Sequence, residues 1–128
     1  MKYIFGFLIF FGHMVSGSTQ NKSLFLDAVA KADVAGLAQH FDSKIELCIN
    51  NKIEYLDQQA ASNSLKSFFD SNPPKSCQAI HKGSSKDKGS VYTIGSLQTT
   101  TGKTFRIYLY VEDNAGKALI KEIRIDKE

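Results

Sequence analysis

Apolar residues recur at helical spacing in three segments of the chain. They share one helical stripe at 23–33, another at 34–41, and a third at 58–70. Asp33 and Asp57 stand directly before the second and third segments, where a carboxylate can accept a free backbone N–H of the first helical turn. The pattern therefore predicts three short helices, of which the second and third are capped by aspartate.

The remaining segments alternate apolar and polar residues, which is typical of half-buried strands. They run over 44–50, 53–55, 77–83, 91–100, 103–113 and 117–126. The predicted order is two helices, a short hairpin, a third helix and a long antiparallel meander. Helices segregated from antiparallel strands indicate the α+β class, in which the sheet would curl around the helices as a half-open cone.

The segment "TFRIYLYVED", 104–113, divides its side chains between the two faces of the predicted sheet. A hairpin loop at 114–116 would pair Ile107 with Ile123, so that the side of the strand that carries Phe105 faces the core. The opposite side is then the convex face, away from the helices. We expect a contact surface there, formed by Arg106, Tyr108, Tyr110, Ile120 and Glu122, with Arg106 and Glu122 as diagonal partners.

The preceding turn is predicted to consist of two residues, 101–102. Such a turn would pair Tyr92 with Val111. This pairing directs Tyr92, Ser96 and Gln98 toward the helices, where a small pocket is the default ligand site of this architecture. In the alternative, Ser96 and Gln98 lie near the rim of the cone and meet solvent.

His81 is the residue that an enzymatic interpretation would use. It shares a predicted strand face with Cys77 and Ala79, a position from which it can point inward. A general base needs hydrogen-bond reach of its proton and a tuned pKa. His81 with Tyr92 would serve an isomerase- or hydrolase-like enzyme, although a lone histidine there is more often structural. The concave face carries no Asp, Glu or His on the later strands, so we expect no catalysis.

No metal site and no cofactor are expected. Cys77 and His81 are four residues apart, a spacing that spans roughly 13 Å on a strand. The polar loop 83–90 joins two strands and offers no helix N-terminus for a phosphate. The chain has two cysteines, Cys48 and Cys77, and either one disulfide or two unpaired thiols fits them.

The first residues, "MKYIFGFLIFFGHMVSGS", are typical of a secretory leader. Lys2 precedes an apolar run, Tyr3 to Val15, that is shorter than the roughly 20 residues of a membrane-spanning helix. Small residues favour cleavage after Gly17. We expect a signal peptide at 1–17, a single domain at 18–128, a periplasmic or secreted location and no stable membrane anchor after cleavage.

Composition narrows the class of partner. The chain is 42% hydrophobic and 23% charged, an ordinary globular balance for 128 residues. Its net charge is +3, and its lysines are spread along the chain. A nucleic-acid binder more often concentrates Lys and Arg in a stripe, so nucleic acid is not expected as a partner.

Several stretches resemble known proteins. The segment "AVAKADVAGLAQHFDSKIEL", 28–47, resembles the opening of the nuclear transport factor 2-like superfamily. Together, "FFDSNPP", "IHKGSS", "YTIGSL", "TGKTFRIYLY" and "IKEIRIDKE" are similar to domain of unknown function 4783, a bacterial family of small exported proteins. The resemblance implies a cone of three N-terminal helices on a curved antiparallel sheet, and an exported location. It implies no activity, and it places a larger apolar residue at the position of Cys77.

These observations favour an exported, non-enzymatic binding or interaction module. Its partner would be a small molecule in the cone or a protein on the sheet. A homodimer through the convex face is one form of the second possibility, because Tyr108, Tyr110 and Ile120 would form a small apolar patch there. The enzyme with His81 and Tyr92 is the alternative function.

Overall fold

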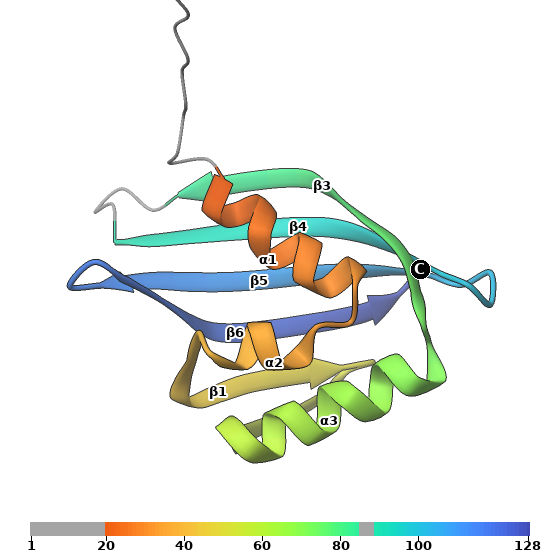
Figure 1. Ribbon diagram of the computed structural model, residues 1–128, viewed down its shortest axis with the longest axis horizontal. Coiled ribbons are helices and arrows are strands. Elements are labelled where there is room, and N and C mark those ends of the chain that lie inside the picture. Colours follow the sequence, from red (N-terminus) through yellow and green to blue (C-terminus); the bar gives the residue numbers. More distant parts are fainter. Residues whose placement is uncertain (1–19, 85–88) are drawn as a thin grey trace, which may run out of the picture.

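Three helices cover one face of a six-stranded sheet in the computed structural model (Figure 1), which describes residues 20–84 and 89–128. The predicted signal peptide lies outside the described residues. The elements are α1 (Gln20–Ala30), α2 (Val34–Ala38), β1 (Phe41–Ile49), β2 (Lys52–Asp57), α3 (Gln58–Ser71), β3 (Pro74–Ser84), β4 (Ser90–Thr99), β5 (Thr104–Asn114) and β6 (Lys117–Lys127). The element order agrees with the sequence prediction.

Local signals place the helix boundaries. The carboxylate of Asp33 accepts a hydrogen bond from the Gly36 backbone N–H at 3.0 Å, and that of Asp57 accepts one from Ala60 at 2.9 Å. Each bond satisfies one of the free donors at a helix N-terminus. Both predicted caps are therefore confirmed. α3 ends at Ser71, and β3 begins at Pro74 after two intervening residues.

The sheet has the strand order β2-β1-β6-β5-β4-β3. Four of its five junctions are antiparallel, but β1 and β6 pair in parallel. The prediction of a wholly antiparallel sheet is wrong at this junction. The last strand returns to lie beside the first, and the alternation within each strand carries no information about that distant neighbour.

Phenylalanine side chains fill the space between helices and sheet. α1 packs on β3 and β4, and α3 packs on β1 and β2. The five described phenylalanines are all buried, and Phe68 meets Phe105 edge to face with ring centroids 5.0 Å apart. They are Phe25, Phe41, Phe68, Phe69 and Phe105. The interior of the predicted cone is thus occupied by the core of the protein.

The β4–β5 hairpin is one residue out of the predicted register. Thr99 pairs with Lys103 around a three-residue loop, and the Thr99 hydroxyl accepts a hydrogen bond from the Lys103 N–H. Gly102 closes this loop at φ +86°, a conformation that favours glycine. As a result Leu97, not Gln98, lies opposite Phe105.

A one-residue shift exchanges the two faces of β4. Gly95 consequently faces α1: a Cβ atom there would lie 3.1 Å from Leu26 Cδ2 and 3.2 Å from the Gln78 carbonyl oxygen. Glycine therefore permits the close approach of α1 to β4. Tyr92, Ser96 and Gln98 turn to the convex side, so the prediction that they line a pocket beneath the helices is wrong.

The β5–β6 hairpin contains a β-bulge that the sequence pattern does not predict. Asn114 pairs with Lys117 around a two-residue loop, not around the predicted loop 114–116, and this sets Val111 opposite Ile120. The register then shifts between Tyr110 and Val111, which leaves Lys121 without a partner on β5. Ile120 is fully buried, with 0% exposure, so its predicted place on the convex face is wrong. Leu119, opposite Glu112, takes the outer position. Lys121 binds Asp42 Oδ2 at 2.6 Å, and this hydrogen bond lowers the pKa of Asp42.

Cys48 and Cys77 are both free thiols in the structure, so of the two alternatives, one disulfide or two unpaired thiols, the structure has the unpaired thiols. Cys48 is fully buried and lies opposite Arg124 of β6. Cys77 packs against the core beside Gly95. Burial, with a smaller effect of the Asp27 charge, raises the pKa of the Cys77 thiol to about 11. Cys77 is therefore a packing residue, protonated at neutral pH.

Candidate functional site on the outer face of the sheet

Tyrosine side chains gather on the face of the sheet that the helices leave uncovered, called the outer face below. Tyr92 on β4 lies opposite Tyr110 on β5, and Tyr108 lies opposite Ile94. The rings of Tyr92 and Tyr108 are stacked, with centroids 6.0 Å apart and planes inclined at 26°. Three tyrosines thus form an aromatic cluster across two neighbouring strands.

His81 joins this cluster from β3. A register shift between Ala79 and His81 places His81 opposite Ile94, whose side chain is on the outer face. Its Nε2 atom lies 3.2 Å from the Tyr92 hydroxyl, within hydrogen-bond distance. The two predicted residues do meet, but His81 is exposed and stands outside the cone. The structure therefore forms no cone pocket from His81, Tyr92, Ser96 and Gln98.

Charged side chains of both signs surround the aromatic cluster. Arg106 pairs with Glu128, Nη2 to Oε2, at 3.1 Å, and Arg124 approaches Asp126, Nε to Oδ2, at 3.9 Å. The diagonal pairing expected between Arg106 and Glu122 is thus replaced by these contacts. The ring of Tyr108 borders a shallow depression of about 230 Å³, lined by Ile94, Arg106, Tyr108, Glu122, Arg124 and Asp126.

The acidic end of the outer face is formed by carboxylates on neighbouring strands. Glu46 on β1 lies opposite Glu122 on β6. Burial raises the pKa of Glu122, and the negative charge of Glu46 adds to the effect. Burial likewise raises the pKa of Tyr108. Glu46 also accepts a hydrogen bond from the Tyr55 hydroxyl at 3.1 Å, which raises the pKa of Tyr55.

Replacing Glu122 with glutamine is expected to raise the midpoint of thermal unfolding at pH 7. A carboxyl group whose pKa is raised by folding opposes folding when it is ionised, and this opposition fades as the pH falls through the folded pKa. Between pH 7 and about 4.5, its ordinary value, the wild type should therefore gain stability relative to Glu122→Gln. Melting curves across this range measure the difference, and a constant difference would contradict the assigned cause.

Two exposed apolar side chains on β2 extend the outer face and were missed from the sequence. Tyr55 is 71% exposed and Ile53 53% exposed. They lie opposite Glu46 and Cys48, which point outward from β1. In the segment "IEY", Ile53 and Tyr55 point to the same face of the sheet. The sequence could have assigned that face only after the inward side of the neighbouring strand β1 was known.

No cluster of three His, Cys, Asp or Glu side chains able to hold a metal occurs within 20–84 and 89–128. In the same part of the chain, no helix combines the length and apolar character needed to cross a membrane.

Comparisons with known proteins identify relatives. The family described as "Domain of unknown function (DUF4783)" matches residues 25–126. A DUF4783 family protein of Bacteroides fragilis YCH46 is 35% identical, with a TM-score of 0.75 over 81% of this chain and 95% of its own. One from Bacteroides ovatus ATCC 8483 is 28% identical, with a TM-score of 0.74 over 80% of this chain and 91% of its own.

More distant structures share the architecture alone. An NTF-2 like protein of unknown function from Silicibacter pomeroyi DSS-3 is 13% identical, with a TM-score of 0.62 over 86% of this chain and 92% of its own. No curated protein matches the chain. The fold is therefore α+β and like that of nuclear transport factor 2.

Proposed function

This chain belongs to the DUF4783 family, and we propose that it works as an exported, non-enzymatic binding module whose contact surface is the outer face of the sheet. The family has no assigned activity, so the proposal rests on the residues of that face. The exported location rests on the leader pattern of residues 1–17.

The distribution of aromatic residues carries the proposal. All five described phenylalanines are in the core, whereas all four described tyrosines are on the outer face. These are Tyr55, Tyr92, Tyr108 and Tyr110. Tyrosine combines a large apolar ring with a polar tip, and it is enriched where protein surfaces meet. The placement of tyrosines on the outer face and phenylalanines in the core supports an outer face that contacts water in the free protein and a partner in a complex.

A second copy of this chain is the partner that the face suits best. Arginines and carboxylates alternate across it, so a facing copy can place acids against bases. A net charge of +3 gives only weak repulsion between copies. A two-fold contact uses the same patch on both molecules and therefore needs no second specialised surface.

The non-enzymatic part of the proposal is supported by the filled interior and by the open position of His81. A general base works best in a site that excludes water and holds the substrate. The His81–Tyr92 pair lies on an exposed strand, and Phe25, Phe41 and Phe68 fill the space where a cone pocket would be.

Sedimentation velocity of residues 18–128 from micromolar to millimolar concentration tests self-association. We expect the weight-average sedimentation coefficient to rise toward that of a dimer. Tyr108→Glu should weaken the association by about tenfold or more, because it places a charge at the centre of the aromatic cluster. Ser67→Glu introduces the same charge on the exposed side of α3 and should leave the association unchanged. A wild-type chain that stays monomeric throughout would contradict the homodimer.

A further inference from the structure

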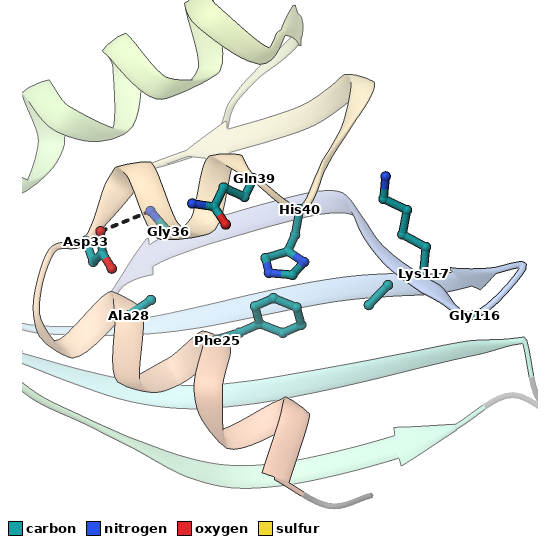
Figure 2. Close-up of a pocket in the computed structure, with 9 residues that line it drawn as sticks. Phe25, Ala28, Asp33, Gly36, Gln39, His40, Gly116 and Lys117 are labelled. Carbon is teal, nitrogen blue, oxygen red and sulfur yellow. Dashed lines mark hydrogen bonds between the residues drawn. The ribbon is translucent and has the colours of Figure 1, made fainter.

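A second candidate site lies at one end of the helical layer. Figure 2 shows side chains that line a cavity between α1, α2 and the start of β6. The volume of this cavity is about 660 Å³. This volume lies within the usual range of small-molecule sites, which is about 300–1,000 Å³. It is separate from the filled interior and from the outer face. Its lining is Phe25, Ala28, Asp33, Gly36, Gln39, His40, Gly116, Lys117 and Ala118.

Two hydrogen-bond donors stand at the β6 end of this cavity. Figure 2 shows the imidazole of His40 over the ring of Phe25, with the side chain of Lys117 beyond it. His40 and Phe25 meet edge to face, with centroids 5.0 Å apart. Among the residues that the structure describes, the His40 ring makes no hydrogen bond and the Lys117 ammonium makes no ion pair. Both groups are available to a ligand.

The other residues of the lining indicate that the cavity favours an anionic ligand over a cationic one. The carboxylate in the lining, that of Asp33, stands at the far end in Figure 2 and already accepts the Gly36 N–H at 3.0 Å. Phe25 and Ala118 add apolar surface to the lining, and the neutral amide of Gln39 lies between Asp33 and His40 in Figure 2. The cavity therefore offers donors at one end and an apolar surface beside them.

From this arrangement we propose that the cavity binds a small organic carboxylate with an apolar body. The carboxylate would accept hydrogen bonds from Lys117 and His40, and charge-assisted bonds of this kind are stronger than neutral ones. The apolar body would cover Phe25, Ala28 and Ala118. The site is independent of the outer face, so it can be occupied in a monomer or a dimer.

Octanoate is a suitable probe, and octan-1-ol is its neutral counterpart with the same carbon chain. We expect titration of residues 18–128 with octanoate, followed by isothermal calorimetry and by amide NMR shifts, to show saturable binding with shifts centred on His40 and Lys117. Octan-1-ol should bind about fivefold more weakly, because it lacks the charge. Equal binding of both probes, or shifts confined to another region, would overturn the proposal.

Two variants identify the donors. Lys117→Gln removes an exposed ammonium group. It should weaken the binding of octanoate by about fivefold and leave the binding of octan-1-ol unchanged. Lys103→Gln makes the same change in the exposed β4–β5 turn, away from the cavity, and should affect neither probe. His40→Leu keeps an apolar contact with Phe25 and should also weaken octanoate selectively. Equal effects of Lys117→Gln and Lys103→Gln would overturn the assignment of Lys117.

Discussion

Replacing Ile120 with lysine is expected to lower the free energy of unfolding by about 4 kcal/mol, the usual cost of an unpaired buried charge. Ile120 is fully buried opposite Val111, inside the apolar core. Urea denaturation followed by circular dichroism measures the loss. The variant is expected to unfold at a much lower urea concentration, or to be unfolded without urea.

Leu119→Lys is the matched control for this prediction. Leu119 is the preceding residue, half-buried on the outer side opposite Glu112, where a lysine can reach solvent and an acidic neighbour. Leu119→Lys should lower the free energy of unfolding by only a small part of the amount that Ile120→Lys does. Similar losses for the two variants, or a larger loss for Leu119→Lys, would contradict the register that pairs Val111 with Ile120.

Phe105→Ala is expected to cost about 3–5 kcal/mol in the free energy of unfolding. The ring of Phe105 is buried against Phe68, so truncation removes buried surface and leaves a cavity beneath α3. The same denaturation experiment gives the value. Loss of a core ring should also change the near-ultraviolet circular dichroism of the folded state.

Tyr55→Ala provides the comparison, because it also removes an aromatic ring from the sheet. Its ring is 71% exposed on the edge strand β2, and its midpoint of unfolding should stay near that of the wild type. If Phe105→Ala lowered the free energy of unfolding as little as Tyr55→Ala, the space between the helices and the sheet would not be a packed core.

Features set by neighbouring residues could be predicted from the sequence. The caps at Asp33 and Asp57 depend on contacts within three residues, and both are present. The inward face of α3 follows from helical spacing, and its Leu65 and Phe68 are buried. The DUF4783 resemblance is confirmed by the match to residues 25–126.

Features set by loop length and by distant pairing could not be predicted. A three-residue loop in place of a two-residue turn moved Tyr92 and Ser96 to the other face, because each one-residue shift inverts a strand. The bulge at Lys121 is stabilised by Asp42, 79 residues earlier, and no local pattern reveals that contact. The two-residue loop 115–116 places Ile120 on the core face, and the bulge keeps Ile123 and Ile125 on that same face.

The candidate site illustrates both outcomes. Arg106, Tyr108, Tyr110 and Glu122 lie on the outer face as predicted, because the alternation in β5 is regular. Glu122 lies opposite Tyr110, two residues from its predicted partner Tyr108, and a shift of two residues keeps a side chain on the same face. Tyr92 and His81 were assigned to the wrong face, yet the structure brings them to the same surface. Tyr55 was missed because β2 is short and its inward side depends on β1.

Ring-selective NMR tests the central claim that the outer face is the binding surface. In residues 18–128, labelled tyrosine rings report on the outer face and labelled phenylalanine rings on the side of the sheet that the helices cover. As the protein concentration rises, the resonances of Tyr92, Tyr108 and Tyr110 should shift and those of the phenylalanines should stay in place. Tyrosine resonances that remain unchanged while the protein associates would contradict the account.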